Sequence, residues 1–135
     1  MYGKNRQFDE RYLAFGAAIL KLLPLLPEGK VGAHISDQLF RSGTSVGAHL
    51  QEARAAESRA DFIHKMSMAL KEMREAKYWL ALVRLAEVLT TDSTHAIFQE
   101  AGELVAILSQ AVITAKTRDN STSNLKCRTS NVQDL

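Results

Sequence analysis

The chain has 135 residues, of which 24% are charged and 7% aromatic, and its formal net charge is +2 at pH 7. A chain of this length forms one domain that can bury its own core without a stabilising disulfide. The single cysteine excludes an intramolecular disulfide, and the small net charge neither requires nor excludes a nucleic-acid partner.

The most apolar run, residues 12–26, contains Lys21 and Pro24 and is too short to span a bilayer. The first ten residues lack the apolar core of a secretory signal. We therefore expect a soluble, cytoplasmic protein with no membrane partner.

Apolar residues at three- and four-residue spacing predict a first helix that begins near Asp9, a candidate N-cap. Pro24 lacks a backbone donor, so the helix should kink or end at residues 23–26, and residues 27–29 should form a turn. The apolar face consists of Phe8, Tyr12, Phe15, Ile19, Leu22, Leu23 and Leu26.

A second helix is predicted over about residues 30–54. Its middle contains Gly43 and Gly47, and each glycine costs a helix about 1 kcal/mol relative to alanine. We therefore expect a neighbouring helix to approach closely at these small residues. The apolar stripe consists of Val31, Ile35, Leu39, Val46 and Leu50.

A short turn at residues 55–57 predicts that the second and third helices are antiparallel neighbours. Ser58 is a good N-cap, with Asp61 three residues later, and the third helix should run to about residue 89. Its apolar residues form two stripes, whereas a monomeric bundle needs only one. The second stripe predicts an oligomer interface that contains Ile63, Leu70, Trp79 and Leu82.

A fourth helix should begin at a cap formed by Asp92 or Ser93 and end near Lys116. Residues 117–135 are polar and aperiodic, which predicts disorder. The predicted fold is therefore an all-α, antiparallel up-down-up-down four-helix bundle over residues 1–116, with a long third helix and a disordered tail over residues 117–135.

Two spacings, Asp61-x-x-His64 and Asp92-x-x-His95, resemble the carboxylate–histidine pairs of metal sites in bundles. They begin helices that start at opposite ends of an antiparallel bundle, so they cannot share one metal. Residues 43–47 are glycine-rich but lack the lysine and the preceding strand of a phosphate-binding loop. We expect no catalytic residue, no metal and no cofactor, and hence no enzyme.

Polar residues on the second and third helices should face each other once the chain folds back at the turn. The first interpretation is an interhelical network, since buried polar groups need partners; it contains Arg41, Ser45, His49, Glu52, Glu72 and Glu75. The second interpretation is a basic, nucleic-acid-binding ridge that contains Arg41, Lys71, Arg74 and Lys77.

Four segments closely resemble the bacterial four helix bundle protein family, also known from proteins encoded in ribosomal-RNA intervening sequences. They are RSGTSVGAHLQEA (residues 41–53), SRADFI (58–63), ALKEMRE (69–75) and YWL (78–80). The order of elements extends the resemblance over residues 8–116. The family usually carries asparagine at the position of His49, whereas Arg41, Ser45 and Glu52 fit its pattern.

The resemblance implies a left-handed bundle that assembles into a ring, typically a pentamer, with no known enzymatic activity. The chain is also similar to the accessory protein of diversity-generating retroelements (accessory variability determinant), a related pentameric bundle that binds nucleic acid and the reverse transcriptase. We therefore expect a non-enzymatic homo-oligomer whose partner is structured RNA. The alternative is a protein-interaction scaffold with no nucleic-acid role.

Overall fold

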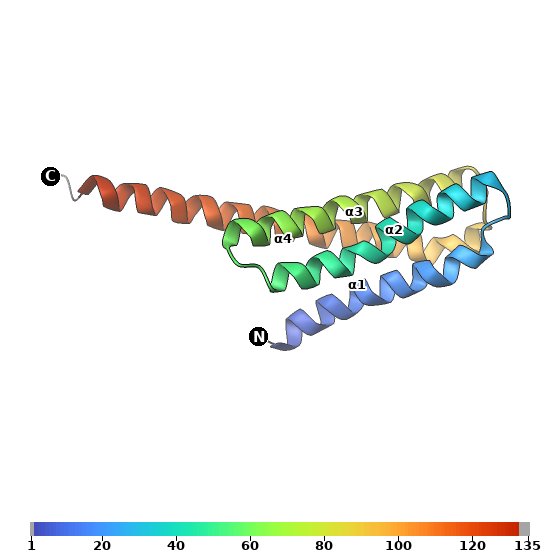
Figure 1. Cartoon of the computed structure of the whole chain (residues 1–135), viewed down its shortest axis with the longest axis horizontal. Helices are drawn as coiled ribbons and strands as arrows, with labels where there is room; N and C mark the ends of the chain where they lie inside the picture. The colour runs from blue at the N-terminus through green and yellow to red at the C-terminus, as the bar shows by residue number, and fades with distance from the viewer. Residues whose placement is uncertain (1, 133–135) are drawn as a thin grey trace.

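The computed structural model describes residues 2–132, which form four α-helices and one 3-10 segment. The elements are α1 (Tyr2–Leu22), η1 (Leu23–Leu25), α2 (Lys30–Arg54), α3 (Arg59–Leu85) and α4 (Thr91–Val132). Consecutive helices run in opposite directions, and α4 extends well beyond the other three (Figure 1). The predicted all-α, up-down-up-down four-helix bundle is confirmed.

Helix α1 begins at Tyr2, about two turns before the predicted start. Asp9 is therefore inside the helix, and its carboxylate accepts hydrogen bonds from Arg54 (2.7 Å) and Gln51 (3.3 Å) of α2. The prediction that Asp9 caps the helix is therefore wrong. A short acidic side chain suits both a helix cap and an interhelical ion pair, and Asp9 forms the ion pair. The predicted end is confirmed, since η1 contains Pro24.

The bounds of α2 agree with the predicted residues 30–54. A Cβ atom on Gly43 would lie only 2.7 Å from Cγ1 of Ile19, so glycine allows α1 to pack against α2 at this point. The expected close approach is therefore confirmed at Gly43. At Gly47 a Cβ atom would meet nothing within 4 Å.

Helix α3 begins as predicted, because the hydroxyl of Ser58 accepts a hydrogen bond from the backbone N–H of Asp61 at 3.0 Å. It ends at Leu85, about one turn before the predicted residue 89. It is longer than α1 and α2, but α4, with 42 residues, is the longest helix.

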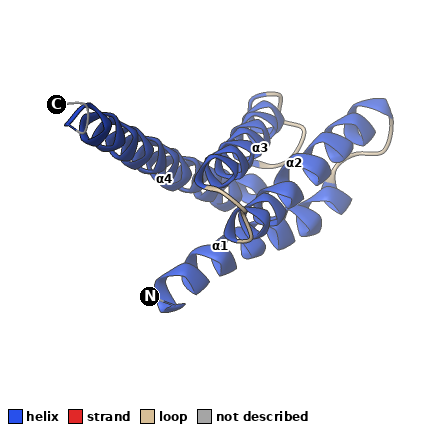
Figure 2. Cartoon of the chain, turned by 60° about the vertical axis from the view of Figure 1, so that its left-hand side comes forward, coloured by secondary structure: helices blue, strands red, loops and turns tan. Residues whose placement is uncertain are grey.

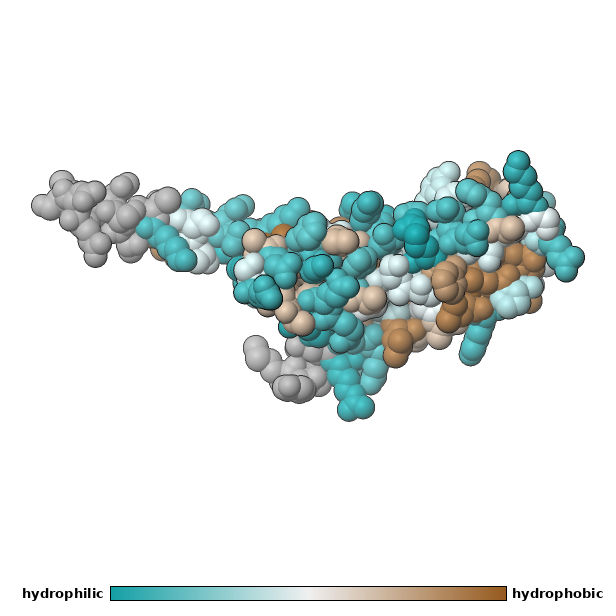
Figure 3. Space-filling model, viewed as in Figure 1, coloured by the Kyte–Doolittle hydropathy of each residue, from teal (hydrophilic) through white to brown (hydrophobic). Residues whose placement is uncertain are grey.

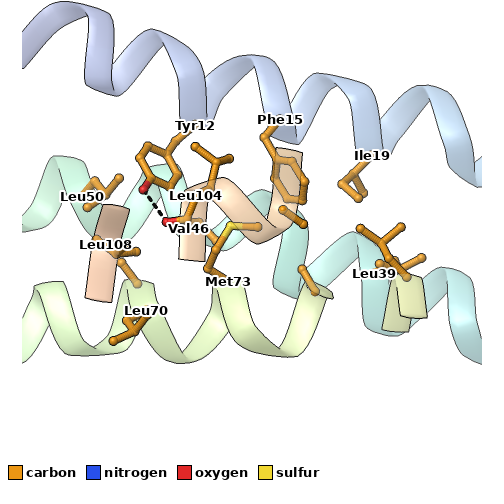
Figure 4. Packing of buried hydrophobic residues seen from close by; sticks show 14 of the residues in the cluster. Tyr12, Phe15, Ile19, Leu39, Val46, Leu50, Leu70, Met73, Leu104 and Leu108 are labelled. Atoms are coloured by element: carbon orange, nitrogen blue, oxygen red, sulfur yellow. Dashed lines mark hydrogen bonds between the residues drawn. The ribbon is translucent and has the colours of Figure 1, made fainter. Parts of the chain in front are cut away.

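The core lies where the inner faces of all four helices meet (Figure 4). Tyr12 is fully buried there, and its hydroxyl donates a hydrogen bond to the carbonyl oxygen of Leu104 in α4 at 3.0 Å. One predicted stripe member is not in the core, since Val31 is 63% exposed at the first turn of α2. The largest fully buried apolar side chains are Tyr12, Phe15, Ile19, Leu39, Met73, Leu80, Leu104 and Leu108.

The polar segment after Lys116 continues α4 as a helix through Val132, whereas we predicted disorder over residues 117–135. The last three residues of that segment lie outside the described residues. The hydroxyls of Thr117, Ser121 and Thr122 each donate to the carbonyl four residues earlier. Once a helix is nucleated, each further residue adds one backbone hydrogen bond, and α4 extends past the end of the bundle (Figure 2).

By length and mean hydropathy, the stretch Asp92–Lys126 of α4 could cross a membrane. The same stretch supplies Ala101, Leu104 and Leu108 to the bundle core. Core helices of soluble proteins share this composition, so the hydropathy of α4 is consistent with its place in the bundle.

Candidate nucleic-acid interface

The best-defined polar cluster joins α2 to α3 around Arg41. Its Nη1 donates to Glu72 Oε2 at 3.0 Å, and its Nη2 donates to Glu75. The indole N–H of Trp79 donates to the same Glu75 carboxylate at 3.4 Å. The hydrogen bond from Arg41 is the main cause that holds the pKa of Glu75 below its ordinary value. The predicted contact of Arg41 with both glutamates is confirmed, and two carboxylates already balance its charge.

A second cluster lies nearer the α2–α3 turn. Lys65 Nζ is 3.0 Å from Glu52 Oε2, and this hydrogen bond lowers the pKa of Glu52. His49 Nδ1 is 3.8 Å from Glu52, too far for a hydrogen bond, and is shielded from solvent with no hydrogen-bond partner among the described residues. The hydroxyl of Ser45 donates to the Arg41 carbonyl within α2. The predicted single network is therefore two separate clusters.

The four residues of the predicted basic ridge do not form one surface. Arg41 is paired with glutamates at the α2–α3 contact, as described above. Lys77 is half-buried, with its Cε atom 3.9 Å from where a Cβ on Gly102 of α4 would lie. Lys71 is exposed, and Arg74 is exposed with Nη2 3.5 Å from Ser109 Oγ. Lys71 and Arg74 thus remain the two side chains of the ridge most open to a ligand.

An ion-pair cluster between α1 and α4 escaped the sequence analysis. Arg11 donates from Nε to Glu100 at 2.6 Å and also pairs with Glu103. These residues are about 90 positions apart, so no spacing pattern connects them. Arg11 precedes core residue Tyr12, and Glu103 precedes core residue Leu104, which places both beside the α1–α4 seam. A charged residue next to a core residue on each helix could have indicated an ion pair between α1 and α4.

The residues of the two carboxylate–histidine spacings have local contacts. The carboxylate of Asp61 accepts a hydrogen bond from the backbone N–H of Glu57 at 3.4 Å at the start of α3. His95 Nδ1 lies 3.5 Å from Arg84 Nη2. Among the side chains that the structure describes (residues 6–90 and 92–126), no three His, Cys, Asp or Glu residues gather in a way that could hold a metal ion.

The predicted oligomer stripe on α3 is largely covered by the subunit itself. Leu70 is 9% exposed and belongs to the subunit core, so its assignment to an interface is wrong. Trp79 is half-buried, and its ring packs edge-on to His34 of α2 at 5.6 Å. Ile63 and Leu82 are half-buried. The apolar periodicity of α3 could not distinguish a core stripe from an interface stripe. Helix α3 packs against both α2 and α4, so both stripes are partly covered within the subunit.

An uncovered apolar surface lies on α1. Residues 12–20 contain no charged side chain, yet only one side of this stretch faces the core. On the opposite side Leu13 is 73% exposed and Leu20 is 47% exposed, with Ala17 exposed between them. We call these three residues the apolar α1 face. Hydrophobic side chains gather over this part of α1 and the adjoining part of α2 (Figure 3).

A hollow of about 1150 Å³ runs between the apolar α1 face and α2. Its α2 wall contains Thr44, Gly47 and Ala48, and Gly16 of α1 also lines it. The small side chains keep the hollow open. A Cβ atom added to Gly47 would touch no described atom of the subunit within 4 Å. The hollow can therefore accept a large apolar group from outside.

Comparison with known proteins found a family model and similar solved structures. Residues 10–110 match the family model described as 23S rRNA-intervening sequence protein. A protein of unknown function from Bacteroides thetaiotaomicron VPI-5482, of the S23 ribosomal protein family, has a similar solved structure with 36% sequence identity and a TM-score of 0.70. That match covers 78% of this chain and 97% of the other. No curated protein matches the chain.

Proposed function

Because the chain belongs to the 23S rRNA-intervening sequence protein family, we propose that it is a non-enzymatic module that assembles with copies of itself and binds nucleic acid. Structured RNA is the proposed ligand, and a five-membered ring is the proposed assembly. The observation that carries the proposal is the uncovered apolar α1 face, since exposed apolar patches of this kind mark interaction sites.

Self-association follows from the surroundings of α1. A helix that is apolar on all sides is normally buried on all sides. In one subunit only the inner side of residues 12–20 is covered, and the outer side borders the hollow beside Gly47. A second copy that packs against Leu13 and Leu20 would cover it, and the missing side chain of Gly47 would allow a close approach.

Nucleic-acid binding rests on basic side chains that self-association leaves open. Lys71 and Arg74 are exposed on α3, whose described backbone does not lie directly beside that of α1. Covering the apolar α1 face therefore leaves them accessible. An assembly repeats this pair once per copy, and repeated cationic positions suit a phosphate backbone.

The second candidate function is a protein-interaction scaffold with no nucleic-acid role. The pairing of Arg41 with Glu72 and Glu75 favours it, since the α3 ridge keeps little unbalanced positive charge. The apolar hollow would then take a helix of another protein.

Light scattering coupled to size exclusion, with and without a structured RNA, tests the two candidates. We expect an oligomer that elutes with RNA at low salt and releases it at high salt, because phosphate contacts release counterions. An oligomer that ignores RNA at every salt concentration would support the scaffold. A monomer at all protein concentrations would contradict both forms of the proposal.

A further inference from the structure

The C-terminal part of α4 leaves the bundle. Ala115 is the last buried residue of α4 among the side chains described up to residue 126, and the side chains of residues 116–118 and 120–126 are all exposed. Figures 1 and 2 show this end of α4 projecting past the turn between α2 and α3. We call residues 116–126 the α4 arm. Its root is held by Arg59, which donates to the Ala115 carbonyl at 3.3 Å and lies 3.8 Å from Asp119.

The α4 arm has no apolar face of its own. Leu125 is the one large apolar residue in its sequence, KTRDNSTSNLK. Ser, Thr, Asn and Asp favour other backbone conformations, and a helix with few tertiary contacts is marginal in water. Arg59 supports the root of the arm, and a ligand bound along the arm would stabilise its helical form further. A membrane does not suit it, because interfacial helices need an apolar face.

Charge is distributed unevenly between the bundle and the α4 arm. Residues 1–115 contain thirteen Lys and Arg and thirteen Asp and Glu, so the bundle has no net charge. The arm contains Lys116, Arg118 and Lys126 against Asp119, a net charge of +2. Residues 127–135 contribute Arg128 and Asp134, which cancel. The whole net charge of the chain is therefore carried by the α4 arm.

We infer that the α4 arm is a nucleic-acid-binding element, whose exposed cationic and amide side chains contact the phosphate backbone and whose helix is stabilised by that contact. This inference rests on the proposed function and names the element that carries it. Hydroxyl, amide and cationic side chains are the groups that commonly bond phosphates. The arm lies beyond residues 10–110, so it adds to the part of the chain that matches the family model.

The test uses the full chain and a fluorescein-labelled RNA hairpin, with binding measured by anisotropy over a series of salt concentrations. The arm variant is Lys116→Gln/Arg118→Gln, which removes two charges while keeping good helix formers. The matched control is Lys21→Gln/Lys30→Gln, which removes two exposed charges from the bundle. For the arm variant, we expect the slope of log K against log salt to fall by about 2 and the low-salt affinity to fall on the order of tenfold.

The control should bind like the wild type. Equal slopes for wild type and arm variant would overturn the inference while leaving the proposed function intact. Wild type that shows no salt-dependent RNA binding would overturn both. Salt-dependent binding of the wild type to poly-glutamate but not to RNA would overturn the inference in favour of an acidic protein partner.

A second variant separates charge from helix formation. Asn120→Pro keeps every charge of the α4 arm but breaks its helix. We expect weaker RNA binding than for the wild type, and no gain in helical circular dichroism when RNA is added. Unchanged affinity and an unchanged helical signal would contradict the claim that the arm binds as a helix.

Discussion

The α2–α3 contact and the outer face of α1 differ in how their exposed side chains are arranged. At the α2–α3 contact, charged side chains are paired across the two helices, with Arg41 on Glu72 and Glu75 and with Lys65 on Glu52. These ion pairs form within one subunit. Helix α1 also packs into the core, but its outer face is apolar and uncovered. This face leaves apolar surface uncovered, so we expect the self-association surface on α1 rather than on the polar face of α2.

The largest expected effect separates the two glycines of α2. Gly43→Leu should lower the free energy of unfolding by about 3 kcal/mol, because its side chain must displace buried Ile19. Gly47→Leu should change subunit stability by less than about 1 kcal/mol, since a Cβ there meets open space. Denaturant titration measures both. Equal losses would mean that α1 does not pack against α2 as described.

The next effect concerns assembly. Leu13→Glu should weaken self-association by about a hundredfold or more, which corresponds to a loss of about 3 kcal/mol in association free energy. The reason is that the substitution would bury a charge without a partner in the interface. Leu82→Glu on α3 is the matched control, and light scattering over a dilution series measures both. Dissociation by Leu82→Glu with Leu13→Glu still assembled would restore the interface predicted on α3.

A smaller effect distinguishes the paired arginine from the open one. Arg41→Ala should cost about 1 kcal/mol of stability, since it leaves Glu72 and Glu75 without their shared counter-charge and the side chains are partly exposed. Arg74→Ala should cost less than about 0.5 kcal/mol. In RNA binding the order should reverse, with Arg74→Ala the weaker binder. If Arg41→Ala had the larger effect on both stability and RNA binding, the assignment of a structural role to Arg41 and a binding role to Arg74 would be contradicted.

The smallest effect is a pH dependence. Arg41 lowers the pKa of Glu75 in the folded state relative to the unfolded chain, where it is about 4.3. The resulting stabilisation is complete above the unfolded value and is lost as the pH falls through the lower folded value. We expect Glu75→Gln to reduce stability at pH 7 by less than about 1 kcal/mol and to flatten the loss of stability below about pH 5. An unchanged acid profile in this variant would contradict the pairing.

Local signals predicted the fold well. Proline at position 24, the cap at Ser58 and the small residues near Gly43 act over a few residues, and each has the predicted consequence. The contact of Arg41 with α3 also followed, because a short turn fixes the register of an antiparallel pair. The start of α1 was predicted too late because Asp9 offers two local interpretations that only a distant partner, Arg54, decides.

The surfaces were harder to predict because exposure depends on all neighbours at once. Leu70 and Leu13 are both leucines on apolar helices, yet the first is buried by the subunit and the second is not. The absence of charge over residues 12–20 was visible in the sequence and could have indicated the apolar α1 face. The helical state of the α4 arm was not visible, since its composition alone predicts disorder.

The projection of the α4 arm has a consequence for an assembled protein. Each copy would contribute one arm of about 16 Å, and the arms would be tethered to one body. Once one arm binds a nucleic acid, the others act at high effective concentration, so avidity would greatly exceed the affinity of a single arm. A small change in subunit association would then switch nucleic-acid occupancy, with no change in any individual contact.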